Sequence, residues 1–221
     1  MDVTQALERR RTVRAFREEP VPRETLVAIL GASLHAPSWA NTQPWEVYVA
    51  GGEPLERIRK VYVERTRREV PARPDLPFPD EWPSVCRERT RLLTAGRADI
   101  LGVPPDDAQF RQDFLQSNRR FFGAPNVVYL CMDRCLTSWS VHDLGMMSQS
   151  IMLAAQDHGV DSAIAVNLVC YPDVIRDELG IPDELLIVIG VALGYADDSD
   201  PSDCFRSPRR PFADVVRLVG I

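Results

Sequence analysis

The chain has 221 residues, of which 45 % are hydrophobic and 26 % are charged, a balance that predicts a globular protein with a full hydrophobic core. Its formal net charge of −6 at pH 7 argues against a nucleic-acid partner, since nucleic-acid binders usually present a basic face. The polar N-terminus lacks the apolar core of a signal peptide, and no apolar run approaches the ~20 residues of a membrane span. We therefore expect a cytoplasmic protein without a membrane partner.

The five cysteines are an odd number and scattered, which suits free thiols in a reducing compartment. Cys131 and Cys135 have neither a second pair of cysteines nor a histidine nearby, so we expect no metal site. His35, His142 and His158 fall on segments with helical patterns, and we interpret them as structural or solvent-facing rather than catalytic.

The first fifty residues predict two helices and a strand. Asp2 and Gln5 are spaced as a capping box, so a short helix should run to residue 8 or 9. The spacing of apolar residues predicts a second helix over 22–35, and alternation predicts a strand over 45–50.

A basic segment, Arg9-Arg10-Arg11-Thr12-Val13-Arg14-Ala15-Phe16, lies between these two helices. Its second half alternates like a strand, which places Thr12, Arg14 and Phe16 on one side and Val13 on the other. The guanidinium groups and the hydroxyl suit an anion, because arginine binds phosphate with paired hydrogen bonds. A solvated basic surface is the alternative interpretation.

The segment Ala36-Pro37-Ser38-Trp39-Ala40-Asn41-Thr42-Gln43-Pro44-Trp45 carries more functional groups than a plain connector. Two carboxamides and two hydroxyls accompany two flat indole rings and two prolines. We interpret this segment as one that holds a flavin.

Residues 66–118 are the least regular part of the chain. Five prolines break the stretch from 71 to 83, and we expect short helices after it and one helix over 106–118. Long excursions of this kind often serve as lids or binding loops, and a surface insertion without a role is the alternative.

The second half of the chain predicts three strands and two helices, which span 126–132, 138–158, 162–166, 172–179 and 185–193. The helix over 138–158 is apolar on most sides, so it must be buried in a large core or at a subunit interface. The run 185–193 is almost free of polar residues, which predicts a central strand. The tail after 197 is polar but ends in apolar residues, so it should dock rather than fray.

These motifs and their order resemble the FMN-dependent nitroreductase family over essentially the whole chain. The resemblance rests on 10–16, 36–45, the helix Asp143-Leu144-Gly145 to His158-Gly159-Val160, the strand end Ala192-Leu193-Gly194-Tyr195 and Arg206-Ser207-Pro208-Arg209-Arg210-Pro211. The segment Phe121-Phe122-Gly123-Ala124-Pro125 is similar to the branch that contains nitroaromatic and nitrobenzoate reductases.

The resemblance implies an α+β fold with a mixed, mainly antiparallel central sheet flanked by helices. It implies one FMN-binding domain over 1–221, with a lid or insert at 66–118. It also implies an intertwined homodimer, in which the long helix crosses the interface and the tail 197–221 wraps the partner and extends its sheet. Two FMN molecules would then lie at the interface, each touched by both chains.

The resemblance also implies the site residues. The FMN phosphate and ribityl chain would face Arg10, Arg11, Thr12, Arg206 and Arg209. Arg14 would approach the pyrimidine end of the flavin ring. From the other subunit, the residues that border the flavin would be Pro37, Ser38, Trp39, Asn41 and Gln43. A backbone N–H of Val166 or Asn167 would meet flavin N5.

Two positions depart from the family pattern. Position 39 is often a small residue, and here Trp39 would either stack beside the flavin and narrow the substrate slot or turn away and pack. The strand end 163–167 lacks the Glu-Gly or Gly-Gly pair of many relatives, but a backbone donor needs no particular side chain.

The implied activity is a ping-pong oxidoreductase that uses NAD(P)H to reduce nitroaromatic or similar electron-poor acceptors. The flavin would carry the chemistry, so we expect no catalytic side chain. Rival interpretations on the same fold are a dehydrogenase, a quinone or ene reductase, a dehalogenase and a flavin destructase. Two rivals without catalysis also stay open, a non-catalytic FMN-binding protein and a plain interaction dimer.

Overall fold

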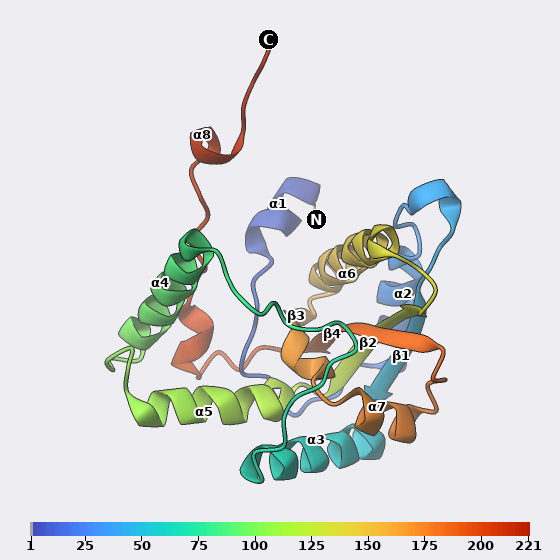
Figure 1. The fold of residues 1–221 in the computed structure, drawn as a ribbon, viewed down its shortest axis with the longest axis horizontal. Coiled ribbons are helices and arrows are strands. Elements are labelled where there is room, and N and C mark those ends of the chain that lie inside the picture. The colour runs from blue at the N-terminus through green and yellow to red at the C-terminus, as the bar shows by residue number, and fades with distance from the viewer. Residues whose placement is uncertain (1) are drawn as a thin grey trace.

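A computed structural model describes residues 2–221, and its centre is a single four-stranded sheet (Figure 1). The strands are β1 (Glu46–Gly51), β2 (Asn126–Asp133), β3 (Asp161–Ala165) and β4 (Leu185–Gly194). Their order is β1-β2-β4-β3, and all three pairings are antiparallel. The α+β class is as predicted. The mixed sheet is a correction, because every strand pairing in the described residues is antiparallel.

Helices cover both faces of this sheet. The α-helices are α1 (Val3–Arg9), α2 (Arg23–Ser33), α3 (Gly52–Arg67), α4 (Ser84–Ile100), α5 (Ala108–Arg119), α6 (Ser138–Asp157), α7 (Pro172–Leu179) and α8 (Phe212–Val215). The short 3-10 helices are η1 (Trp39–Asn41), η2 (Phe121–Gly123), η3 (Val166–Val169) and η4 (Pro201–Cys204). Within this described part of the chain, no helix combines the length and the apolar character needed to cross a bilayer.

Alternation along the strands divides the core into two layers. Val127 and Tyr129 of β2 belong to the cluster that packs against α3 and α7. Val128 and Leu130 point the other way, into the cluster that packs against α2 and α6. Figure 1 shows these helix pairs on opposite sides of the sheet. The run Leu185–Gly194 lies between β2 and β3 and is mostly buried, which confirms the predicted central strand.

The long helix α6 is buried along one stripe, which consists of Ser140, Leu144, Met147, Ile151 and Ala155 with their neighbours. Another face, formed by Gly145, Met146, Gln149 and Leu153, stays exposed or half-buried. Within one chain the helix is therefore not buried on several sides, although this second face is also mostly apolar.

The region 66–118 is more regular than predicted. The expected short helices are one helix, α4, because the stretch from Ser84 to Ile100 contains no proline and many strong helix formers. Asp107 caps α5 by accepting the Phe110 N–H at 2.7 Å. Asp75 fixes the proline-rich part, since its Oδ2 accepts the Ile187 N–H at 2.7 Å.

The C-terminal tail leaves the body of the chain and ends in solvent (Figure 1). Its apolar side chains are exposed, among them Phe212 at 66 %, Leu218 at 61 % and Val219 at 88 %. The apolar end of the tail therefore does not dock on the described part of its own chain.

Candidate functional site

The two predicted groups of arginines meet around Asp203, at the root of the tail. Arg11 Nη1 donates to the Asp203 carbonyl, and Arg206 Nη1 donates to the same oxygen at 2.9 Å. The Arg14 N–H donates to Asp203 Oδ1 at 2.6 Å. Asp203 is only 4 % exposed, and this burial raises the pKa of its carboxyl. The fold thus joins the N-terminal segment to the tail through one buried acid.

Positive charge exceeds negative charge in this cluster. Burial and the nearby guanidinium of Arg209 lower the pKa of Arg10. Burial and the charge of Arg97 lower the pKa of Arg14 to about 10, although Asp203 opposes this effect. In the described part of the chain, neither Arg10 nor Arg209 forms an ion pair. Like charges held this close favour an added anion.

The basic segment itself is less regular than predicted. Val13 and Phe16 both belong to the core cluster beside α3, so the expected alternation is wrong at Phe16. The reason is that the segment turns to reach several neighbours: the Val13 N–H donates to Ser162 O at 3.0 Å, and the Phe16 N–H donates to Phe122 O at 3.0 Å. Half-buried Thr12 accepts a bond from Arg14 Nη1 on its carbonyl at 3.0 Å.

Arg97 of α4 is a member of the cluster that the sequence did not reveal. Its guanidinium lies over the rings of Phe114 and Phe205, at 5.1 and 5.7 Å from their centroids. Its Nε is buried without a hydrogen-bond partner, and burial lowers its pKa. A Cβ added at Gly96 would lie only 2.8 Å from the Phe205 ring, which is too close for a normal contact. Helix α4 therefore packs closely on the root of the tail.

The segment 36–45 is held in a strained conformation. Ala40, Asn41 and Gln43 have positive φ angles of 50°, 56° and 46°. Such backbone persists only where other contacts fix it, and it is frequent at ligand sites. Here the Gln43 N–H donates to Ser38 Oγ at 2.9 Å, and the Trp39 N–H donates to Asp143 Oδ2 at 3.1 Å.

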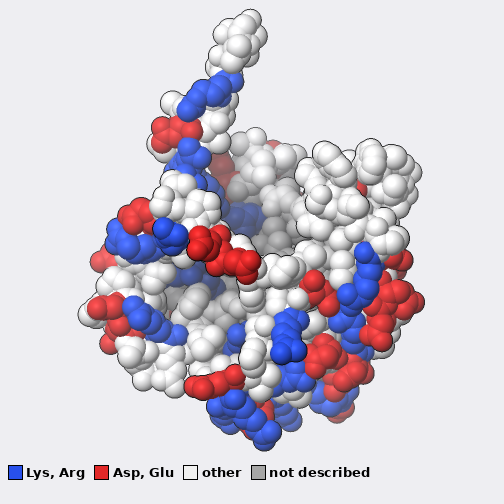
Figure 2. Space-filling view, viewed as in Figure 1, with Lys and Arg blue, Asp and Glu red and all other residues white. Residues whose placement is uncertain are grey.

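This segment does not meet the arginine cluster within one chain. Figure 1 shows it beyond α6, on the side away from α1 and the tail. Figure 2 shows a deep hollow between the two sides, with basic side chains along the α4 and tail wall and few charges on the opposite lobe. Pro37, Trp39, Asn41 and Gln43 are exposed on that lobe, and Ser38 is half-buried.

The two candidate N5 donors follow the edge strand β3. Val166 is 51 % exposed and begins η3. Asn167 is half-buried, and its Nδ2 donates to Asn118 Oδ1 at 2.9 Å. Asn118 is 4 % exposed and lies on α5 of the insert, so this bond ties the insert to the turn after β3.

Comparison with known proteins identifies the family of this chain. The model of the Nitroreductase family matches residues 7–195. The chain belongs to the nitroreductase family. The resemblance predicted from the motifs is thereby confirmed.

Several relatives of this nitroreductase are similar over nearly their full length. Nitroreductase NfnB of Mycolicibacterium smegmatis is 34 % identical, covering 99 % of this chain and 94 % of that one. Nitrobenzene nitroreductase of Ectopseudomonas oleovorans is 38 % identical, covering 88 % and 86 %. The crystal structure of an FMN- and NADPH-dependent NfnB from Sphigopyxis sp. strain HMH superposes with a TM-score of 0.93 at 31 % identity, and each chain is covered completely.

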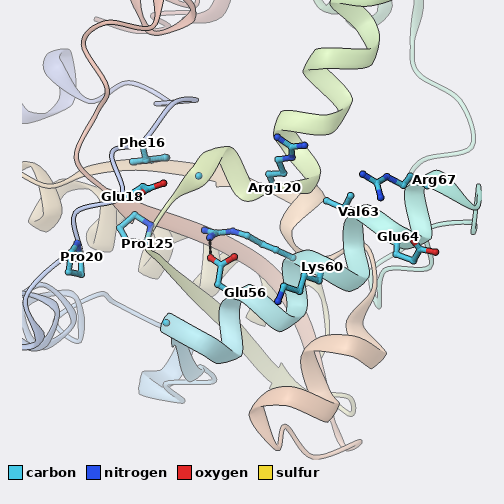
Figure 3. Close-up of a pocket in the computed structure, with 13 residues that line it drawn as sticks. Phe16, Glu18, Pro20, Glu56, Lys60, Val63, Glu64, Arg67, Arg120 and Pro125 are labelled. Carbon is cyan, nitrogen blue, oxygen red and sulfur yellow. Dashed lines mark hydrogen bonds and ion pairs between the residues drawn. The ribbon is translucent and has the colours of Figure 1, made fainter.

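Cavity volume alone does not locate the site in this nitroreductase. A cavity of ≈ 1070 Å³ runs along α3, between Phe16 and Pro125 on one side and Val63 and Arg67 on the other (Figure 3). It contains none of the predicted site residues. A smaller cavity of ≈ 490 Å³ lies beside Arg14, between α5 and η4.

Four contact residues escaped the sequence-based prediction: Arg97, Asn118, Asp143 and Asp203. Asp203 stands in an acidic run that looks like any solvated tail, and Arg97 stands in a helix with many arginines. Their roles depend on partners far away along the chain, which no local pattern reports.

Proposed function

We propose that this nitroreductase binds FMN and uses NAD(P)H to reduce nitroaromatic compounds by a ping-pong mechanism. The sequence predicted this activity, and the names of the relatives support it, since they include an FMN- and NADPH-dependent enzyme and a nitrobenzene reductase. We keep other flavin chemistry on the same fold as the alternative.

The arginine cluster is the observation that carries the cofactor assignment. A phosphate monoester brings up to two negative charges and several acceptor oxygens. Arg10 and Arg209 lack carboxylate partners within the described chain, and the buried Arg97 Nε lacks any partner there. The donor set therefore fits the phosphate of FMN, which would offset the repulsion between these guanidinium groups.

We propose that the flavin site is completed by a second chain. The segment 36–45 and the arginine cluster lie on opposite sides of α6, so one chain offers only half of the predicted contacts. The open face of α6 and the exposed apolar tail are two surfaces that a partner copy would bury. An intertwined homodimer satisfies all three observations, with the tail 197–221 wrapped around the partner.

Within the insert, we assign the role of a lid to α4 and α5. These helices contact the arginine cluster through Arg97 and the β3 turn through Asn118. The proline-rich stretch before them is unsuited to that role. Asp75 fixes this stretch to the core, because its Oδ2 accepts hydrogen bonds from the Ile187 N–H and from Arg176 Nη2, the latter at 2.5 Å.

Bound FMN would supply hydride transfer between NAD(P)H and the acceptor. The chain's own residues would orient the flavin and polarise its ring. Arg14 would place a half-buried positive charge at the pyrimidine end of the ring. The backbone N–H of Val166, a residue that is 51 % exposed, would meet N5. Arg10, Arg11, Thr12, Arg206 and Arg209 would hold the phosphate end. No side chain needs to act as an acid or base.

The test is an anaerobic absorption spectrum of the purified protein. We expect a flavin band near ~450 nm that bleaches on addition of NADPH or NADH and returns on addition of nitrobenzene. A band that does not bleach would indicate a non-catalytic flavin-binding protein. A protein that stays colourless after FMN is added would indicate an interaction dimer. Bleaching that a nitroaromatic panel fails to reverse would favour another flavin enzyme.

A further inference from the structure

Two tryptophans form an exposed pair at the end of α6. Trp39 is 65 % exposed and Trp139 is 63 % exposed. Their ring centroids lie 6.2 Å apart, and the ring planes are tilted by 47°. The lobe that carries them is almost free of charge on the face seen in Figure 2. Large apolar side chains gathered on an uncharged surface usually mark a binding site.

The fold fixes the geometry of this pair. Trp139 lies in the first turn of α6, and Asp143 follows four residues later on the same helix, one turn along. The Asp143 carboxylate is buried, with the residue only 2 % exposed, and it accepts the Trp39 N–H at 3.1 Å. One helical turn therefore carries one indole and anchors the backbone of the other.

Backbone strain around Trp39 adds to this rigidity. Ala40 and Asn41 directly follow Trp39 with φ angles of 50° and 56°, which non-glycine residues rarely adopt. A flat side chain presented on a fixed backbone binds with little loss of conformational entropy. The two indoles are thus prepared for a flat ligand rather than left exposed by a loose loop.

We propose that Trp39 and Trp139 form an aromatic clamp that binds the ring of the acceptor on the outer faces of the two indoles, with Asp143 as its positioning residue. The indoles contact each other, with ring centroids 6.2 Å apart, so the acceptor stacks on the pair rather than between its members. The proposal rests on the proposed function, because Trp39 is flanked by Ser38 and Asn41, which would border the flavin of the partner chain. Indole faces are electron-rich and nitroarene rings are electron-poor, so stacked rings attract through complementary quadrupoles. The clamp selects flat, electron-poor aromatic acceptors over non-aromatic ones.

The test compares Trp139→Ala and Trp39→Ala with wild type for two acceptors, nitrobenzene and ferricyanide, under NADPH. The clamp predicts that KM for nitrobenzene rises between about 2-fold and 10-fold, the range expected for losing one aromatic stacking partner. For Trp139→Ala, which lies outside the predicted flavin contacts, it predicts unchanged turnover with ferricyanide and an unchanged rate of flavin reduction by NADPH. Trp139→Phe should retain most of the affinity.

Trp82→Ala is the matched control. Trp82 is 53 % exposed but lies in the proline-rich stretch before α4, outside the clamp. Its replacement should change neither KM nor turnover with either acceptor. A Trp139→Ala variant that loses activity equally with both acceptors would show a structural role and overturn the clamp. A variant that separates into monomers on gel filtration would show an interface role and also overturn it. An unchanged KM for nitrobenzene would also overturn it.

These outcomes are distinct from failure of the proposed function itself. The comparison starts from wild-type enzyme whose flavin NADPH reduces. A wild type that binds no FMN contradicts the proposed function. If the wild type is active and the tryptophan substitutions affect both acceptors alike, only the clamp is contradicted.

Discussion

Arg14 is a half-buried cation whose charge is unfavourable in the chain without an anion. Burial and Arg97 both lower its pKa, to about 10 from an ordinary value of 12.5. For a base with a lowered pKa, the unfolded chain binds more protons between these two values, so stability rises with pH across that window. At pH 7 the charge therefore lowers stability.

The first prediction concerns Arg14→Met. We expect the FMN-free variant to be more stable than wild type at pH 7, by roughly 1–3 kcal/mol, since it removes a partly desolvated charge that Arg97 repels. FMN should then stabilise the variant less than it stabilises wild type. Thermal unfolding with and without FMN measures both effects. A variant that is less stable than wild type without FMN would contradict this explanation of the cluster.

At this scale the sequence predicted residue types better than partners. The density of arginine in 9–14 indicated an anion site, and the structure brings Arg10 and Arg11 together with Arg209 and Arg206. The connecting acid, Asp203, was missed because its neighbours in the sequence are also acidic.

At the scale of elements, α5 and η3 are joined by a pair of side-chain amides. Asn118 Nδ2 donates to Phe114 O at 2.6 Å, and Asn118 Oδ1 accepts from Asn167 Nδ2 at 2.9 Å. Cys170 Sγ lies 3.6 Å from Asn167 Oδ1 and donates to it. The buried amide of Asn118 therefore holds the insert against the turn that would face flavin N5.

The second prediction is that Asn118→Ala lowers the free energy of unfolding by about 1–3 kcal/mol, because it leaves the Asn167 amide unsatisfied. Asn118→Ala combined with Asn167→Ala should cost less than the sum of the two single changes. Urea denaturation of the four proteins measures this coupling. Gln112→Ala, on the exposed side of α5, is the control and should be close to neutral. Additive single changes would show that the amide pair is not a unit.

Elements with strong periodicity were predicted well, and those set by tertiary contacts were not. The apolar run of β4 and the pattern of α6 indicated their type and almost their bounds. The sequence predicted short helices after the proline-rich stretch, yet α4 is a single helix of 17 residues. The 3-10 turns η1 and η2 contain non-glycine residues with positive φ, which no local preference predicts.

At the scale of the whole molecule, the two predicted halves of the flavin site lie on opposite sides of α6. The arginine cluster lies beside the tail, and the segment 36–45 lies beyond α6 (Figure 1). The central claim is that each FMN is held by the cluster of one chain and the segment of its partner. Two chains damaged in different halves should then restore one complete site.

The decisive measurement uses a mixed dimer. One chain carries Arg10→Ala with Arg209→Ala, the other carries Ser38→Ala with Asn41→Ala, and different affinity tags allow isolation of the dimer that contains both. Each parent dimer should bind FMN weakly and have little nitrobenzene reductase activity. The mixed dimer should bind about one FMN and have about half of the wild-type activity, because one of its two sites is intact. A mixed dimer as inactive as its parents would contradict the two-chain site.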